Sequence, residues 1–235
     1  MKIVFVHGAL VFDGEWWWHR MVEPLAALGL DSRTLELPSC VAPQRPTEEP
    51  PGDMYADADA VRALLDEEDE PVVLVGHSYG GMVITDAAAG HPNVRHLVYV
   101  TSVMPERGET MASLGGSREP GPWMDPQPAD GTMGIKAELA PDAFMQDCDE
   151  EAVAGALKRL TRQPLAVFGQ TPRGVAWRER PSTYVVCAED RATPPEAQRG
   201  HAKRAGKVVE MPTGHHPMLS RPDLLARVLV EERPR

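Results

Sequence analysis

Cysteine is scarce in this sequence, and its spacing suits neither a metal site nor a disulfide framework. Three cysteines are present, Cys40, Cys148 and Cys187, and they lie far apart in the chain. Structural zinc sites and disulfide-rich folds need closely spaced or evenly paired cysteines. We therefore expect reduced thiols and no metal or other cofactor.

Long apolar runs and an excess of positive charge are also missing. No apolar run reaches the roughly 20 residues that a membrane-spanning helix requires, and the start, MKIVFVHGAL, is interrupted by His7 and Gly8 too early for a signal peptide. Lys and Arg number 24 against 35 Asp and Glu, which gives a net charge of -11. Such a chain offers no basic field to nucleic acid or to an anionic membrane. We expect a cytoplasmic protein with neither as a partner.

The residues that are present suit an α/β domain. Short apolar runs alternate with segments of helical periodicity, which predicts a mostly parallel, doubly wound sheet with helices on both faces. The runs expected to form strands are 2–6, 32–37, 72–75, 94–100, 183–187 and 207–211. The segments expected to form helices are 15–28, 54–65, 82–89, 194–205 and 222–232.

Residues 104–180 depart from this alternation. They are rich in Gly, Pro and Met, with short helical stretches near 142–146 and 150–160. Since they follow the fourth strand, we expect a small helical cap inserted into a core formed by 1–103 and 181–235. The apolar residues of the cap would line a substrate pocket or fill the cap's own core. The candidate substrate contacts are Met104, Trp123 and Met145 of this region, with Leu10 and His216 of the core.

One motif in the sequence is typical of a catalytic nucleophile. Gly76-His77-Ser78-Tyr79-Gly80 lies between an expected strand and an expected helix, which is the pattern of a nucleophile elbow. Glycine is required at positions 76 and 80 because a side chain there would collide with the neighbouring elements. The motif taken alone could also be a flexible turn. In its context it predicts that Ser78 is a nucleophile.

An acid and a base follow two later strands. Asp190 and His215 each lie just beyond an expected strand, and the carboxyl ends of parallel strands meet at one edge of the sheet. A serine hydroxyl needs an imidazole to take its proton and a carboxylate to orient that imidazole. Glu189 and His216 are the adjacent alternatives. We favour Asp190, which lies farther past the strand, and His215, which follows a glycine and does not precede a proline.

The loop after the first strand is a candidate oxyanion loop. It reads His7-Gly8-Ala9, and a backbone N–H there could serve as the second donor beside that of Tyr79. Ala9 is the first choice for this donor and Leu10 the alternative, and a simple turn is the other interpretation of the loop. The Tyr79 ring is expected to lie beside the nucleophile and to shape the acyl pocket.

These residues resemble the α/β-hydrolases of the esterase and hydroxynitrile-lyase group, which includes plant esterases that hydrolyse methyl salicylate. The matching stretches are VFVHGA at 4–9, VLVGHSYGGMV at 73–83, HLVYV at 96–100, CAEDRATPPEAQ at 187–198 and GHHPMLSRP at 214–222. The resemblance implies the α/β-hydrolase fold, the catalytic triad Ser78, Asp190 and His215, and oxyanion donors at Ala9 and Tyr79.

Hydrolysis is favoured within this group. The hydroxynitrile lyases carry Thr, Cys and Lys where this chain has Ala9, Tyr79 and His216. We expect a cofactor-free serine esterase that acts on a small to medium hydrophobic or aromatic ester through an acyl-enzyme. The alternatives are a lyase or carbon–carbon bond hydrolase with the same triad, and a small-molecule binder with little turnover. A homodimer is left open.

Overall fold

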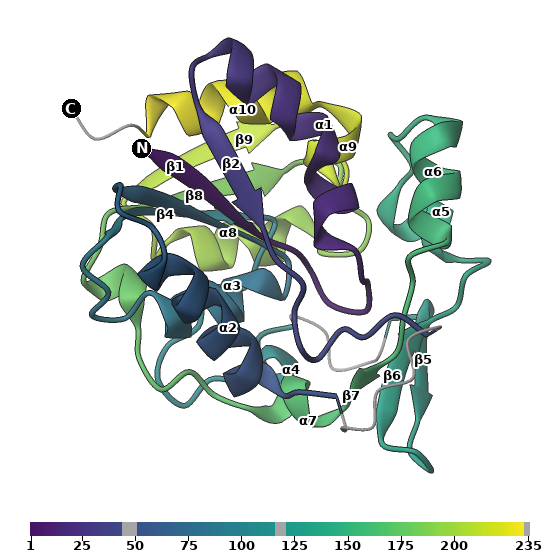
Figure 1. The fold of residues 1–235 in the computed structure, drawn as a ribbon. Coiled ribbons are helices and arrows are strands. Elements are labelled where there is room, and N and C mark those ends of the chain that lie inside the picture. The colour runs from purple at the N-terminus through teal and green to yellow at the C-terminus, as the bar shows by residue number, and fades with distance from the viewer. Residues whose placement is uncertain (44–50, 116–120, 233–235) are drawn as a thin grey trace.

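The computed structural model describes residues 1–43, 51–115 and 121–232. Its centre is a six-stranded parallel sheet in the order β2-β1-β3-β4-β8-β9 (Figure 1). The strands are β1 Lys2–Val6, β2 Asp31–Thr34, β3 Val72–His77, β4 Val94–Val100, β8 Ser182–Cys187 and β9 Lys207–Met211. The parallel, doubly wound sheet that the sequence predicts is therefore confirmed. The bounds differ most for the second strand, which ends at Thr34 and not at Leu37, and β3 runs two residues further than expected.

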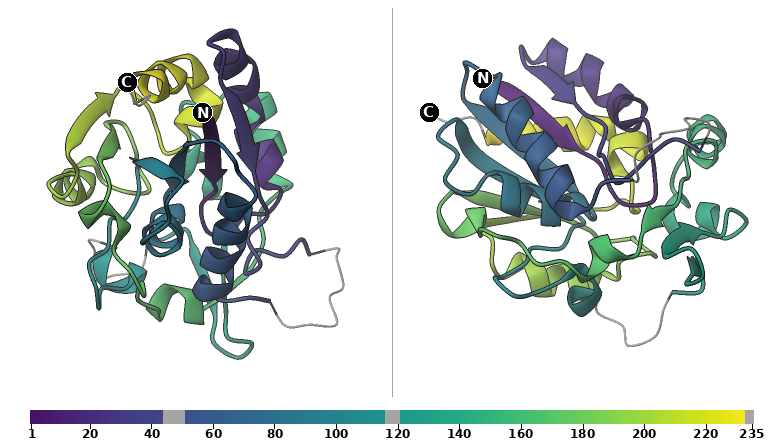
Figure 2. Two further views of the ribbon diagram at one scale, coloured as in Figure 1. Left: turned by 60° about the vertical axis from the view of Figure 1, so that its left-hand side comes forward. Right: turned by 60° about the horizontal axis from the view of Figure 1, so that its bottom comes forward.

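Helices cover both faces of this sheet (Figure 2). One face carries α1 Gly14–Ala27, α9 Pro217–Ser220 and α10 Pro222–Glu231, and the other carries α2 Met54–Asp66, α3 Gly80–Ala87 and α8 Pro195–Ala202. Successive strand residues point to opposite faces, so that Ile3 and Phe5 pack toward α1 while Val4 and Val6 pack toward α2 and α3. The Phe5 ring stacks on Trp18 of α1 with ring centroids 4.1 Å apart. None of the described helices is long and apolar enough to cross a membrane.

The insertion lies beside the end of the sheet toward which β1 runs (Figure 1). It contains the helices α4 Met111–Leu114, α5 Ala140–Phe144, α6 Glu150–Leu157 and α7 Ala166–Gly169 and a 3₁₀ turn, Ala176–Arg178. Thus α5 and α6 form where the helical stretches are expected. The insertion also holds a three-stranded antiparallel sheet that the sequence analysis does not anticipate, made of β5 Met124–Gln127, β6 Thr132–Ile135 and β7 Gln163–Pro164.

Candidate active site

The nucleophile elbow joins β3 directly to α3. Ser78 has a φ of 53°, in the left-handed region that few non-glycine residues occupy. A Cβ on Gly76 would lie 2.7 Å from the carbonyl oxygen of Gly80, and a Cβ on Gly80 would lie 2.7 Å from that of Val6. Both positions therefore require glycine. The half-buried Ser78 is held at the carboxyl edge of the sheet.

A hydrogen-bonded acid–base pair forms at the same edge, between residues that follow β8 and β9. His215 Nδ1 lies 2.7 Å from Asp190 Oδ2, and both side chains are buried. Burial by itself would raise the pKa of Asp190. The charge and hydrogen bond of His215, with a further bond of 2.5 Å from Thr101 Oγ1, outweigh burial and lower the pKa of Asp190 below its ordinary value. The pair therefore holds a carboxylate against an imidazole, as proton transfer from a serine requires.

The adjacent alternatives do not form this pair. The Glu189 carboxylate makes no hydrogen bond to His215 or His216 in the described part of the chain, although the Glu189 backbone N–H donates to Thr213 O. The His216 ring is buried with its centroid 4.8 Å from that of Trp17. Burial, reinforced by the neighbouring histidines, holds the pKa of His216 well below its ordinary value. The structure thus brings together Asp190 and His215, the pair that the sequence analysis favours.

The third link of the triad is open. In the part of the chain that the structure describes, no hydrogen bond joins Ser78 Oγ to His215 Nε2. Hydrogen bonds of this kind are often long without substrate and tighten when substrate binds. The two groups follow β3 and β9, which end at the same edge of the sheet.

Two backbone N–H groups near Ser78 are free to donate. The N–H groups of Ala9 and Tyr79 have no acceptor among the residues that the structure describes. The N–H of Leu10, the alternative, instead donates to Gln163 Oε1 at 3.1 Å. A Cβ on Gly8 would lie 3.3 Å from Ser78 Cβ, so the loop after β1 lies directly against the elbow. Ala9 and Tyr79 therefore suit an oxyanion better than Leu10 does.

The Tyr79 ring does not shape an acyl pocket, contrary to our expectation. It has no exposed surface and lies in the core on the α2 and α3 side of the sheet. Its hydroxyl donates to Asp57 Oδ2 at 2.7 Å. This hydrogen bond directs the ring into the core, while the Tyr79 backbone stays beside the nucleophile.

The predicted substrate contacts divide into two groups. Trp123 is half-buried, and its ring centroid lies 4.8 Å from that of Phe144, which in turn lies 5.2 Å from that of His215. Met104 has no exposed surface, so a contact with substrate would require the core to open. Met145, Leu10 and His216 are also buried, with exposed fractions of 3%, 4% and 6%.

The sequence analysis assigned no site role to Thr101, and it counted Phe144 only among the apolar residues of the cap. Thr101 directly follows β4, and the topology places the ends of β4 and β8 at the same edge. The sequence could therefore have placed Thr101 near Asp190, which follows β8. Phe144 contacts His215 through the folding of the insertion, for which the sequence shows no regular pattern.

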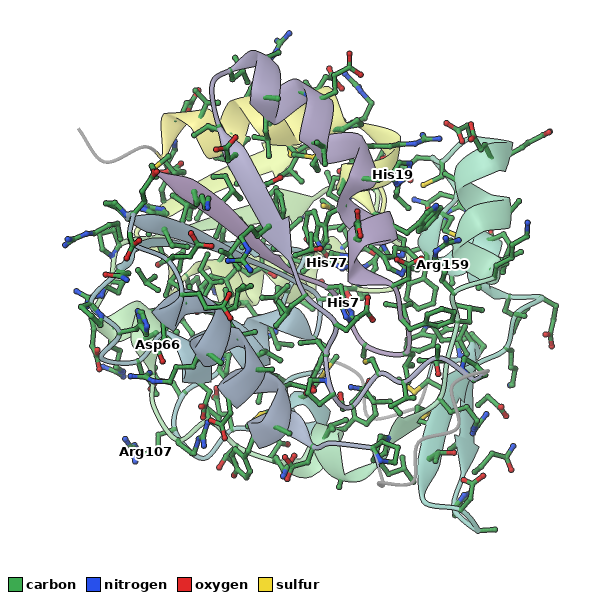
Figure 3. The ribbon with its side chains drawn as sticks, viewed as in Figure 1. His7, His19, Asp66, His77, Arg107 and Arg159 are labelled. Atoms are coloured by element: carbon green, nitrogen blue, oxygen red, sulfur yellow. The ribbon has the colours of Figure 1, made fainter. Side chains whose placement is uncertain are left out.

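Two histidines, His7 and His77, support the loops of the site. Val6 pairs with Gly76, so His7 and His77 emerge together at the ends of β1 and β3 (Figure 3). His77 Nε2 lies 2.8 Å from the carbonyl oxygen of His215, and His7 Nδ1 lies 2.9 Å from that of Gly8. Burial and the nearby His215 lower the pKa of His77 to about 3, so its ring is neutral and Nε2 carries the proton. The described residues contain no metal-binding group of three or more His, Cys, Asp or Glu side chains.

A serine on a strained elbow, an Asp–His pair and two free backbone N–H groups at the carboxyl edge of a parallel sheet define the class of serine-hydrolase-like α/β proteins. Residues 3–228 match the model of the alpha/beta hydrolase family, and the chain belongs to that family. The resemblance stated from the sequence is thus confirmed.

Relatives with known names include several esterases. The alpha/beta hydrolase nvfD of Aspergillus novofumigatus is 30% identical over 97% of this chain and 94% of its own length. Methylesterase 8 of Arabidopsis thaliana is 27% identical over 95% of this chain and 86% of its own length. A pyrethroid hydrolase from Sphingobium faniae JZ-2 has a similar structure, with a TM-score of 0.85 and 26% identity over 98% of this chain and 96% of that chain. These relatives mark the protein as an esterase-type hydrolase.

Proposed function

We propose that the protein is a serine hydrolase that cleaves a carboxylic ester through an acyl-enzyme on Ser78. The observation that carries the proposal is the buried Asp190–His215 pair at the sheet edge where Ser78 occupies its left-handed turn. The names of the relatives, which include methylesterases and a pyrethroid hydrolase, support an ester as the bond that is cleaved.

The mechanism follows from these groups. Ser78 Oγ attacks the ester carbonyl while His215 Nε2 takes the hydroxyl proton, and Asp190 stabilises the imidazolium that forms. The carbonyl oxygen becomes an oxyanion, which accepts hydrogen bonds from the N–H groups of Ala9 and Tyr79. His215 then returns the proton to the leaving alcohol. Water deacylates Ser78 by the same steps, which releases the carboxylic acid and regenerates the serine hydroxyl.

Aromatic surface beside the base favours a hydrophobic or aromatic substrate of small to medium size. Phe144 packs edge-on to the His215 ring, and the half-buried Trp123 packs edge-on to Phe144. Such surfaces contribute hydrophobic contact area and favour ring-to-ring packing.

The test is the Ser78→Ala variant, assayed on p-nitrophenyl acetate, butyrate and benzoate. We expect kcat to fall by several powers of ten, because the nucleophile of a triad acts with its base as a unit. A fluorophosphonate should label the wild type and leave Ser78→Ala unlabelled. Ser220→Ala is the matched control, because the Ser220 hydroxyl is buried and has no hydrogen-bond partner in the described structure. Undiminished turnover by Ser78→Ala would refute the acyl-enzyme, and tight binding of an aromatic acid without turnover by the wild type would indicate a binder.

A further inference from the structure

A continuous set of buried hydrogen bonds runs from the elbow to the loop after β1. We call it the Tyr79–Leu10 network, and its members are Tyr79, Asp57, Ser39, Gln163 and Leu10. Tyr79 Oη donates to Asp57 Oδ2 at 2.7 Å, and Ser39 donates to the same carboxylate from Oγ at 2.5 Å and from its backbone N–H at 2.8 Å. Gln163 Nε2 donates to Ser39 Oγ at 2.6 Å, and Gln163 Oε1 accepts the Leu10 N–H at 3.1 Å.

Every member of the Tyr79–Leu10 network is buried. Tyr79, Asp57, Ser39 and Gln163 have no exposed surface, and Leu10 is 4% exposed. Water therefore cannot replace a lost partner, and each broken bond would leave an unpaired polar group in the core. Such a network holds its members more rigidly than surface hydrogen bonds would.

The donor directions in the network are fixed by chemistry. The Leu10 N–H and the Ser39 N–H can only donate, so Gln163 must present its oxygen to Leu10 and Asp57 must accept from Ser39. The Gln163 amide then points its N–H₂ at Ser39 Oγ, and that hydroxyl donates onward to Asp57. Burial and the nearby Asp57 raise the pKa of Tyr79, which keeps its proton as a donor. All the bonds lead toward one carboxylate.

The ends of the network lie beside the two donors of the proposed oxyanion hole, the N–H groups of Tyr79 and Ala9. One end is Tyr79, whose backbone N–H is free beside Ser78. The other end is the N–H of Leu10, which belongs to the peptide that follows Ala9. Leu10 has a φ of 64°, a left-handed conformation that is unfavourable for a leucine. The hydrogen bond that the Leu10 N–H donates to Gln163 holds Leu10 in this conformation and so fixes the peptide next to the Ala9 N–H.

The insertion supplies Gln163 and further contacts to the same loop. Thr161 N–H donates to Leu10 O at 2.9 Å, and Phe12 N–H donates to Arg159 O at 3.0 Å. Val11 and Leu160 form an antiparallel bridge between these segments. The loop that carries Ala9 is therefore held by the insertion on one side and by the elbow on the other.

We infer that Asp57 and Gln163 are positioning residues that set the separation of the Ala9 and Tyr79 N–H groups through the Tyr79–Leu10 network. The inference rests on the proposed function, since it concerns the oxyanion hole of that hydrolase. It assigns a role in catalysis to two residues that do not touch the reacting atoms.

The test compares Tyr79→Phe and Gln163→Leu with the wild type. Losing an oxyanion donor outright costs roughly 100- to 1000-fold in kcat, and displacing one should cost less. We expect each variant to lower kcat about 10- to 100-fold with KM within about twofold of wild type. The affinity for an aryl trifluoromethyl ketone, which forms a tetrahedral adduct on serine, should fall by the same factor. The affinity for the corresponding methyl ketone should not change.

Tyr99→Phe is the matched control. Tyr99 is also a fully buried tyrosine, and its hydroxyl lies 2.8 Å from Thr85 Oγ1, outside the Tyr79–Leu10 network. We expect it to lower the melting temperature much as Tyr79→Phe does while kcat stays at the wild-type value. If Tyr79→Phe likewise lowers only the melting temperature, the positioning role is refuted. Tyr79→Phe keeps the ring and its packing, so it decides the question if Gln163→Leu does not fold.

Hydrogen exchange separates this inference from the proposed function. The Leu10 amide should exchange faster in Gln163→Leu and also in Tyr79→Phe, where the change lies at the far end of the network, and not in Tyr99→Phe. Slow Leu10 exchange in Tyr79→Phe would refute the coupling even in an active enzyme. A wild type without Ser78-dependent esterase activity would refute the proposed function, whereas faster Leu10 exchange would still establish the coupling between the two loops.

Discussion

Asp190 shows how a buried carboxylate stays charged beside an imidazole. Its Oδ1 accepts the N–H groups of Ala192 and Thr193, and its Oδ2 accepts from His215, Thr101 and Gln198. Hydrogen bonds to the charged form lower a carboxyl pKa, and here they oppose the cost of burial. The carboxylate can therefore orient His215 without taking its proton.

Replacing Asp190 by Asn should leave the fold intact and remove most of the activity. The Asn side chain can still accept from Ala192 and Thr193, but its amide would favour the wrong His215 tautomer. In a comparable triad that change costs about 10⁴-fold in kcat. Steady-state kinetics on a p-nitrophenyl ester measure the loss, and Glu189→Gln is the control that should retain activity. If only Glu189→Gln lost activity, Glu189 and not Asp190 would be the carboxylate of the triad.

The contrast between Ser78 and Tyr79 shows what the sequence could predict at this scale. The position of Ser78 follows from its own neighbours, because two glycines and the strand–helix boundary define the turn. The direction of the Tyr79 ring depends on Asp57, which lies 22 residues earlier in the chain on another helix. No local pattern encodes that partner, and the expected pocket role for the ring was therefore wrong.

Among the elements, the junction of β3 and α3 leaves no room for a side chain at Gly76 or Gly80. We expect Gly76→Ala to destabilise the protein by several kcal/mol and to abolish activity, because its Cβ would lie 2.7 Å from the backbone oxygen of Gly80 and neither backbone can move away cheaply. Urea denaturation measures the loss of stability, and ester turnover measures the loss of activity.

The control for this change is Gly200→Ala. Gly200 lies in α8, and nothing lies within 4 Å of the Cβ that alanine would add. Alanine is favoured over glycine in a helix by about 1 kcal/mol, so this variant should be slightly more stable and fully active. Equal effects of the two substitutions would show that the elbow is not sterically constrained.

The insertion also holds the loops of the acid and the base. The N–H of Gly214, just before His215, donates to Asp147 Oδ2 at 2.7 Å. Gln146 Nε2 donates to the carbonyl oxygen of Glu189, just before Asp190, at 2.7 Å. Two adjacent residues of the insertion therefore bind the backbones on both sides of the Asp190–His215 pair.

Asp147→Ala should lower kcat about tenfold with a small loss of stability, because the Gly214 N–H would lose its acceptor and the backbone before His215 would be less firmly held. Asp149→Ala is the matched control two residues away. Asp149 caps α6 and pairs with Arg20 on the surface, so its loss should cost about 1 kcal/mol of stability and leave kcat unchanged. Parallel kinetics and thermal melts on both variants distinguish the two. Equal kcat values would contradict a positioning role for Asp147.

At the scale of elements, the sequence predicted the core and missed the sheet in the insertion. The buried core strands are apolar runs, and β4 and β9 form at the predicted bounds. In the insertion, β5 and β6 have four residues each, with Pro126 and Gly134 inside them, and β7 has two. Strands this short have no readable alternation, and β7 pairs with β6 across an intervening pair of helices.

For the molecule as a whole, buried neutral histidines govern the response to acid. Burial lowers the pKa values of His7, His77, His201 and His216, and that of His77 falls to about 3. In the unfolded chain these side chains titrate near 6.5. Below that pH the unfolded state binds protons that the folded state does not, so stability must fall as the pH falls.

We therefore expect the free energy of unfolding to decrease between pH 6.5 and 5, by up to about 1.4 kcal/mol per pH unit for each such histidine. The carboxylates with lowered pKa values, such as Asp149 at about 2, lose their contribution only at more acidic pH, so the histidines dominate this window. Urea denaturation at pH 7, 6 and 5 measures the slope. His77→Gln should make the slope shallower by about the contribution of one proton. A stability that stays constant from pH 7 to 5 would mean that these histidines become protonated within the fold.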